Sequence, residues 1–246
     1  MSATGIRVRK QGAAVRITLD GDPQRNAVTP ATLDTMCDAL ATAAGDEDVR
    51  VVVLAGEGRA FCAGADLTRL PDDPAVIMTA ASRAIRRIAD VPIPVIASVH
   101  GPAAGFGVSL VAAADVSVAG ASATFSLPFA HLGLMPDGGL THLLATHIGR
   151  AAAAELVYSG RRVGAEEAAA TGLVSRVVAD AELDGSVDEL VSHLAEVPRR
   201  ALTLTKGALH ASGRAHLDRA LDLEAAGQAE LLDHLDRTSL AAFRTR

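Results

Sequence analysis

The chain has 246 residues, of which 49% are hydrophobic and 21% are charged, and its formal net charge is −6. This length and composition are typical of a globular protein with one large domain, or with a domain and a small appendage. The negative charge excludes the basic face that nucleic-acid binding needs, and an aromatic content of 2% leaves few side chains on which bases could stack.

The sequence predicts a cytoplasmic protein that does not bind a membrane. The charged N-terminus is not followed by the apolar segment of a secretory signal peptide. The longest apolar stretch, residues 91–118, is interrupted by prolines and contains Asp115, so we do not expect it to span a bilayer. Cys37 and Cys62 lack the spacing of a metal site and could form at most one bridge, which indicates a reducing compartment.

The chain begins with signals for a hairpin and a helix. Residues 6–10 and 13–20 alternate apolar and polar side chains on either side of a glycine turn, which predicts two paired strands. Thr29 and Pro30 predict the start of a helix that stops near Gly45, because Thr favours the N-cap and Pro the first helical position.

Two continuous apolar runs follow, at residues 49–54 and Val95–Val99. Runs of this kind predict strands that are buried on both faces of a sheet. Between them, residues 76–89 show a helical pattern, which ends before the prolines at 92 and 94.

Short strands are predicted at residues 115–119 and 123–127. Beyond them the pattern is mostly helical, with one strand near 173–178 and a helical tail from Glu182 that Pro198 divides. Strand and helix units followed by a helical tail favour an α/β fold with a helical appendage.

Two loops of small residues, 61–67 and 103–107, follow the two buried strands. Small residues let the backbone approach a ligand closely, and the first amides of a helix, which the second loop begins, have no partner within that helix. Two such amides at one point would form an oxyanion hole, a pair of donors for a developing negative charge. Taken alone, the pattern is more typical of tight packing, and neither a Walker motif nor a dinucleotide-binding glycine motif is present.

Four segments occur in a fixed order along the chain. They are Arg25-Asn-Ala27, Ala60-Phe-Cys-Ala-Gly-Ala-Asp-Leu67, the run from Pro94 through His100 to Gly107, and Ala168-x-x-x-Gly172-Leu-Val-Ser. In this order and spacing, over essentially the whole chain, they resemble the crotonase superfamily, which is the enoyl-CoA hydratase/isomerase family.

The resemblance implies an α/β fold, a crotonase-like spiral of ββα units over residues 1–180, which holds the CoA and active site. Residues 181–246 would then form a C-terminal helical trimerisation region. The resemblance also implies an acyl-CoA thioester as the substrate, no cofactor besides this coenzyme A, no metal, and a homotrimer or a dimer of trimers.

The resemblance also assigns roles to individual residues. The backbone amides of Ala65 and Phe106 fall where the family binds the thioester oxygen. The family usually has glycine at the second place; Phe106 keeps the amide donor and bears on the shape of the acyl pocket. The residues that fall at contacts with CoA are Arg25, Ala27, Ala63, Asp66 and Leu67.

Hydratases of this family hold a water molecule with two glutamates, and both are missing here. Ser109 stands at the first place, and Phe129 follows Pro128 at the second. Serine cannot act as a general base near neutral pH without a partner, and phenylalanine cannot act at all. We therefore expect no two-glutamate hydratase chemistry.

One carboxylate remains in this region, that of Asp137. Pro128-Phe-Ala-His-Leu-Gly133, followed by Met135-Pro-Asp-Gly-Gly139, resembles the peroxisomal-type Δ3,Δ2-enoyl-CoA isomerases, in which a lone catalytic glutamate falls at the place of Asp137. Ring-modifying CoA isomerases and 4-chlorobenzoyl-CoA dehalogenase have aspartate at the equivalent place. A purely structural interpretation is that Asp137 only caps the helix that starts at 138 or 139.

Three functions therefore stay open. The first is an isomerase that moves the double bond of a 3-enoyl-CoA to the 2-position. The second is hydratase, dehalogenase or ring-acting chemistry through Asp137, and the third is a non-catalytic acyl-CoA carrier. His131, beside the site, is a weaker catalytic candidate, while His100, His142 and His147 are expected to be structural.

Overall fold

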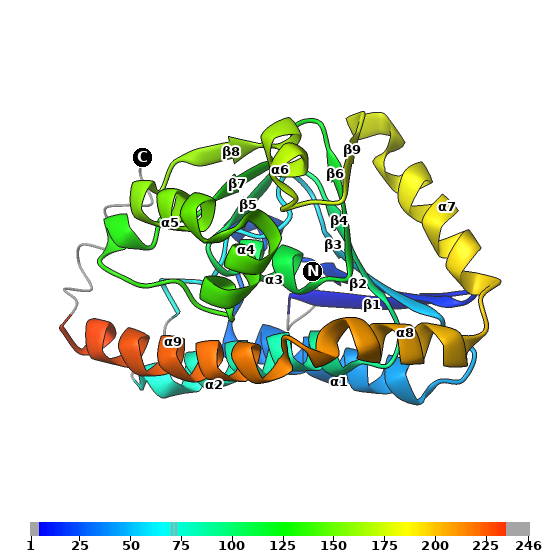
Figure 1. Ribbon diagram of the computed structural model, residues 1–246, viewed down its shortest axis with the longest axis horizontal. Helices are drawn as coiled ribbons and strands as arrows, with labels where there is room; N and C mark the ends of the chain where they lie inside the picture. Colours follow the sequence, from blue (N-terminus) through cyan, green and yellow to red (C-terminus); the bar gives the residue numbers. More distant parts are fainter. Residues whose placement is uncertain (1–4, 70, 72, 235–246) are drawn as a thin grey trace.

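The computed structural model describes residues 5–69, 71 and 73–234. Its centre is a six-stranded sheet with the order β1-β2-β3-β4-β6-β9 (Figure 1). The first two strands form the predicted antiparallel hairpin, and every later neighbour is parallel. The strands are β1 (Ile6–Gln11), β2 (Ala14–Leu19), β3 (Val51–Gly56), β4 (Val95–Val99), β6 (Val116–Gly120) and β9 (Arg176–Val178).

The apolar runs at β3 and β4 are buried on both faces of this sheet, as predicted. Val52 and Leu54 join the core that includes α1 (Pro30–Gly45) and α2 (Pro74–Asp90). Val51 and Val53 face the other way, into a second core with α7 (Leu183–Ala195). β3 begins at Val51 rather than at 49, because the amide of Val49 donates to Asp46 O (3.1 Å) in the turn after α1.

A second, three-stranded sheet has the order β5-β7-β8. Its strands are β5 (Pro102–Ala104), β7 (Thr124–Ser126) and β8 (Arg162–Gly164). The sequence predicted a strand at β7 but none at β5 or β8. Both become strands by pairing with β7, for example through the register of Phe125 with Val163.

The predicted helix start at Thr29 is confirmed. The Thr29 side chain accepts a hydrogen bond from Thr32 N (3.3 Å), and Thr32 Oγ1 accepts one from Thr29 N (3.2 Å). Pro30 is the first helical residue and Gly45 the last. The remaining elements are α3 (Phe106–Ala113), α4 (Leu140–Ile148), α5 (Arg150–Ser159), α6 (Ala165–Thr171), η1 (Asp22–Gln24), η2 (Ala130–Leu132) and η3 (Asp180–Glu182).

The tail forms α7, α8 (Arg199–Ala211) and α9 (Arg214–His234). Pro198 divides it as predicted, and a second break that was not predicted falls between α8 and α9. α9 lies alongside α2 (Figure 1), where Arg86 donates to Asp218 (2.7 Å) and Asp222 (3.0 Å). The division at residue 180 stays a prediction. The last twelve residues of the predicted trimerisation region lie outside the described residues.

A buried ion pair ties α8 to the sheet. Lys206 is 5% exposed, and its Nζ donates to Asp115 Oδ2 (2.7 Å) and to Ile88 O (2.8 Å). The second carboxylate oxygen of Asp115 lies 2.8 Å from His210 Nε2. A buried charge of this kind needs such partners, since an unpaired one is strongly destabilising.

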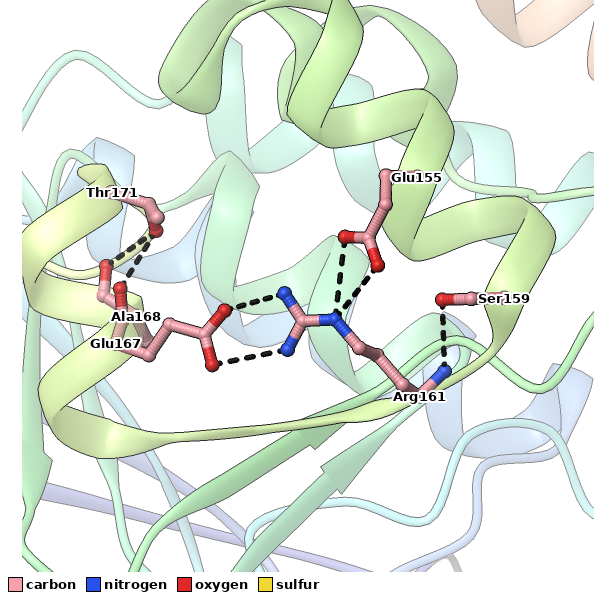
Figure 2. Close-up of polar contacts among 6 residues, drawn as sticks. All are labelled: Glu155, Ser159, Arg161, Glu167, Ala168 and Thr171. Carbon is pink, nitrogen blue, oxygen red and sulfur yellow. Dashed lines mark hydrogen bonds and ion pairs between the residues drawn. The ribbon is translucent and has the colours of Figure 1, made fainter.

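An exposed ion-pair network joins α5 and α6 across β8 (Figure 2). Arg161 Nε donates to Glu155 (2.9 Å), and its two terminal nitrogens donate to the carboxylate of Glu167 (2.5 and 3.0 Å). These contacts hold the two helices on either side of the short strand. Among the described helices, none is long and apolar enough to cross a membrane.

Candidate active site

A pocket lies where the loops that follow β3 and β4 meet, and α9 covers one side of it. It is lined by Ala63, Gly64, Ala65, Leu67, Ile77, Met78, Gly105, Phe106, Pro128, Phe129, Leu132, Leu134, Asp137, Gln228 and Leu232. Only two of these side chains, Asp137 and Gln228, are polar. A largely apolar pocket with a few polar groups is typical of a small-molecule site.

The two small-residue loops touch each other at this pocket. Cys62 and Ala103 form a parallel bridge, and Ala104 N donates to Cys62 O (2.9 Å). Gly64, with φ +91°, lies so close to the second loop that a Cβ on it would be 2.9 Å from Ala104 O and 3.4 Å from Phe106 N. Small residues in the loops therefore permit a close approach of one backbone to the other.

The amides of Ala65 and Phe106 are both available at this place. Their neighbours are bonded: Asp66 N donates to Val28 O (2.8 Å) and Gly105 N to Ser126 O (3.0 Å). Within the described part of the chain, neither Ala65 N nor Phe106 N donates a hydrogen bond. Phe106 is the first residue of α3, whose N-terminus has no side-chain cap. Two free amides on one pocket can bind a developing oxyanion.

The ring of Phe106 packs away from solvent, against the segment that carries Asp137. A Cβ on Gly138, where φ is +69°, would lie 2.8 Å from both Phe106 Cε2 and Ser109 Cβ. Glycine at 138 therefore makes room for the phenylalanine that stands where the resembling family usually has glycine.

Asp137 is 8% exposed, and its Oδ1 has no hydrogen-bond partner among the described residues. Burial, followed by repulsion from the Glu224 carboxylate, raises the pKa of Asp137 to about 7. The backbone of this residue is fixed, because Ser109 Oγ donates to Asp137 O (2.8 Å). Ser109 thus holds the backbone of Asp137 in place. Its hydroxyl donates to a carbonyl oxygen and, among the described residues, is hydrogen-bonded to no base that would activate it.

The interpretation of Asp137 as a helix cap is wrong. α4 begins at Leu140, its N-cap is Gly139, and no side chain of its own segment caps it. Glu224 of α9 caps this helix instead, because its carboxylate accepts from Gly139 N (2.6 Å), Thr141 N (2.8 Å) and Thr141 Oγ1 (2.6 Å). A carboxylate there is favoured by the partial positive charge of a helix N-terminus.

Sequence analysis missed Glu224, and no local signal could have found it. It is 1% exposed and 83 residues distant along the chain from Thr141. Burial raises the pKa of Glu224, while the hydrogen bonds from Thr141 and Gly139 act in the opposite direction.

The residues assigned to CoA contacts fall into two groups. Ala63 and Leu67 line the pocket with Ala65, whereas Arg25, Ala27 and Asp66 do not. The exposed Arg25 is joined to this loop through its carbonyl, which accepts from Ala63 N (2.9 Å). Asp66 Oδ1 accepts from Thr68 N (3.0 Å) and Thr68 Oγ1 (2.5 Å).

Asn26, between two of the assigned residues, positions the first loop. It is 1% exposed and has a positive φ of 59°. Its Nδ2 donates to Ala60 O (2.7 Å) and Glu57 O (2.9 Å), and its Oδ1 accepts from Gly21 N (2.9 Å). The motif Arg25-Asn-Ala27 contained this residue, but the prediction gave no role to its side chain.

The histidines and Cys62 have structural surroundings. His131 is exposed, lies outside the pocket lining, and its Nε2 is 2.8 Å from Ser159 O. His100 and His147 contact backbone carbonyls in the same way. Burial raises the pKa of Cys62 to about 12, so this thiol stays neutral. Within the described ranges, no group of three or more His, Cys, Asp or Glu side chains could hold a metal ion.

Comparison with known proteins gives a consistent result. Residues 9–246 match the family model described as enoyl-CoA hydratase/isomerase. The chain is 38% identical over 238 residues to a probable enoyl-CoA hydratase of Rhodobacter capsulatus, with 95% of this chain and 91% of that protein covered. It is 35% identical over 216 residues to 1,2-epoxyphenylacetyl-CoA isomerase of Escherichia coli, with 85% and 82% covered.

Solved structures show the same similarity in three dimensions. An enoyl-CoA hydratase of Mycobacterium avium subsp. paratuberculosis superimposes with a TM-score of 0.87 at 37% identity, over 93% of this chain and 90% of that one.

Proposed function

The chain belongs to the enoyl-CoA hydratase/isomerase family, and we propose that it moves the double bond of a 3-enoyl-CoA to the 2-position with Asp137 as its single base. As a member of this family it is an acyl-CoA enzyme. The crotonase-type α/β fold with a C-terminal helical region, which the sequence predicted, is confirmed.

One observation carries the proposal. The pocket holds a buried carboxylate oxygen without a partner, on Asp137, together with the two free amides of Ala65 and Phe106. No other carboxylate among the described residues lines this pocket. Isomerisation needs one base, whereas the hydration of a double bond by this family uses two glutamates.

The reaction follows from these groups. The thioester oxygen accepts hydrogen bonds from the amides of Ala65 and Phe106, and Asp137 takes a proton from C2. The electrons move into a dienolate, whose oxygen the two amides stabilise; one such donor contributes about 10²–10³-fold in rate. The protonated Asp137 then returns a proton to C4, and the double bond lies between C2 and C3. One hydrogen leaves C2 and one arrives at C4, so no water and no cofactor is consumed.

The CoA part of the substrate is placed from the positions that match the family's CoA contacts. We place the CoA part along Arg25, Ala27, Ala63, Asp66 and Leu67. Ala63 and Leu67 share the pocket lining with Ala65, which supports this placement. An assembly of three or six chains is a further proposal, supported by leucines of α8 and α9 that are 56–74% exposed: Leu204, Leu209 and Leu223. The cytoplasmic location stays a prediction.

A ring-acting isomerase is the second candidate. The relative from Escherichia coli is named 1,2-epoxyphenylacetyl-CoA isomerase, and the chain covers 82% of it at 35% identity. The same base and oxyanion donors would serve such a substrate.

Purified protein is assayed with hex-3-enoyl-CoA, crotonyl-CoA and 1,2-epoxyphenylacetyl-CoA. We expect conversion of hex-3-enoyl-CoA to the 2-enoyl ester and a drop of about 10²–10⁴-fold in Asp137→Asn, the usual size of a general acid–base contribution. Asp73→Asn, at the exposed cap of α2, is the matched control and keeps activity.

Each other outcome identifies a different function. Hydration of crotonyl-CoA at a rate within tenfold of a two-glutamate hydratase would overturn the proposal. Conversion of the epoxide alone selects the ring-acting candidate. Tight binding of acyl-CoA without turnover of any ester selects the carrier.

A further inference from the structure

α9 contributes a polar side chain to the far part of the pocket. Gln228 is 4% exposed and lines the pocket together with Leu232, which lies one turn further along the helix. The neighbouring side chains, Ile77, Met78 and Leu134, are apolar. Asp137 Oδ1 is the one fully buried side-chain nitrogen or oxygen atom without a partner among the described residues, so any end of the Gln228 amide that lacks a partner is accessible.

The orientation of this amide follows from its one partner. Met135 N lies 3.1 Å from Gln228 Oε1, and because a backbone N–H can only donate, the oxygen must be at this end. The Met135 side chain also packs closely on α9, since a Cβ on Gly227 would be 2.4 Å from Met135 Sδ. The amide nitrogen, Nε2, is therefore the end of the side chain that Met135 leaves without a hydrogen bond.

This nitrogen has no acceptor among the described residues. Asp137 does not provide one, because neither of its carboxylate oxygens is hydrogen-bonded to Gln228, and its Oδ1 has no partner at all among the described residues. The pocket thus contains an unpaired acceptor on one element and an unpaired donor on another, and the two do not bond to each other. A ligand that carries an oxygen can satisfy the donor.

We propose that Gln228 selects acyl groups that carry an oxygen acceptor beyond the reacting carbons, such as a hydroxyl, keto, ether or epoxide oxygen. The placement rests on the proposed function, in which the thioester oxygen lies at Ala65 and Phe106 and C2 to C4 lie at Asp137. The rest of the acyl group then occupies the part of the pocket beneath α9. There an oxygen accepts from Gln228 Nε2, whereas a plain alkyl chain leaves this donor buried and unpaired. A site built to hydrogen-bond its substrate discriminates strongly against the analogue that lacks the group.

The test compares kcat/KM for hex-3-enoyl-CoA with that for 3-hexenoyl-CoA esters that bear a hydroxyl at C5 or at C6. Wild type is expected to favour at least one hydroxylated ester by about tenfold or more, within the range that hydrogen-bonding sites reach. Gln228→Met removes the donor with little change in shape and brings the ratio close to one. Gln228→Glu keeps an acceptor for Met135 N but replaces the donor, and it too loses the preference. Glu230→Gln, an exposed position on the same helix outside the pocket lining, is the control and leaves the ratio unchanged.

A wild-type ratio of one or less for both hydroxylated esters would overturn the proposal, as would a ratio that survives in Gln228→Met. A binding measurement tests the role of Gln228 separately from the proposed isomerase activity. Titration calorimetry with hexanoyl-CoA and the 5- and 6-hydroxyhexanoyl-CoA esters needs no turnover. If wild type isomerises none of the esters, the proposed function is wrong, and the affinity ratio in wild type and Gln228→Met alone decides the role of Gln228.

Discussion

Asp137 and Asp66 are both 8% exposed, but their surroundings differ. Thr68 donates two hydrogen bonds to Asp66, whereas Asp137 Oδ1 accepts none from a described residue. Hydrogen bonds stabilise a carboxylate, and burial without them stabilises the neutral acid. Asp137 can therefore hold a proton near neutral pH. The proposed reaction requires this, because the same carboxyl group takes a proton from C2 and returns one to C4.

The same burial predicts that Asp137 destabilises the fold at high pH. Its pKa is raised from 3.8 to about 7, so the folded state holds the proton more tightly than the unfolded chain. The resulting stability is fully present below about pH 4 and is lost as the pH rises through 7. Asp137→Asn, which carries no charge, should thus stabilise the protein relative to wild type at pH 8, by at most about 4 kcal/mol at 1.4 kcal/mol per pKa unit.

Chemical denaturation of both proteins at pH 5 and pH 8 measures this effect. The difference in unfolding free energy between mutant and wild type should be larger at pH 8. An equal difference at both pH values would show that the carboxyl group is solvated in the folded protein. Asp66→Ala should instead lower stability, because it removes the acceptor of both hydrogen bonds from Thr68.

The site residues that the sequence predicted lie in short loop motifs that can be recognised along the chain. Ala65, Phe106 and Asp137 were found in this way and line one pocket. Glu224 and Gln228 were not found, since a helix of mixed polarity does not reveal which of its side chains is buried against a distant loop. Their burial depends on where α9 docks, and that is a property of the tertiary structure.

The contact between α9 and the start of α4 affects the candidate base, Asp137, more directly than any other contact between elements described above. Glu224 accepts two backbone hydrogen bonds at the start of α4, and its charge opposes ionisation of Asp137. Glu224→Gln keeps the size of the side chain and removes the charge. We expect the pH profile of kcat/KM to rise through about pH 7 in wild type and to shift to lower pH in this variant.

A purely structural role would lower activity at every pH and leave the profile in place. The weaker cap should also reduce the free energy of unfolding by about 1 kcal/mol. Glu230→Gln, an exposed glutamate on the same helix, is the control and should change neither quantity. An unshifted profile in Glu224→Gln would mean that its charge does not act on Asp137.

Length alone did not decide which elements were predicted, since the three-residue strands β7 and β9 were predicted as well as longer ones. The hairpin, α1 and the buried strands β3 and β4 have five or more residues with clear periodicity or caps. β5 and β8 have three residues each and exist because β7 pairs with both. Pairing between segments that are distant in the sequence cannot be seen in either segment alone.

The whole molecule brings five distant segments to one pocket: residues 63–67, 77–78, 105–106, 128–137 and 228–232. The first four lie within the spiral, and the fifth belongs to the helical tail. α9 is thereby part of the site as well as of the surface that carries the exposed leucines. The sequence placed the tail in a separate region and therefore gave it no role in the chemistry.

In the proposed reaction Asp137 moves a hydrogen from C2 to C4 and adds no water. NMR of the product formed from hex-3-enoyl-CoA in D₂O tests it directly. We predict hex-2-enoyl-CoA with one hydrogen fewer at C2, one newly delivered hydrogen or deuteron at C4 and no deuterium at C3. Asp137→Asn should form this product about 10²–10⁴-fold more slowly. A 3-hydroxyhexanoyl-CoA product, or the same labelled 2-enoyl ester formed as fast by Asp137→Asn, would contradict the account.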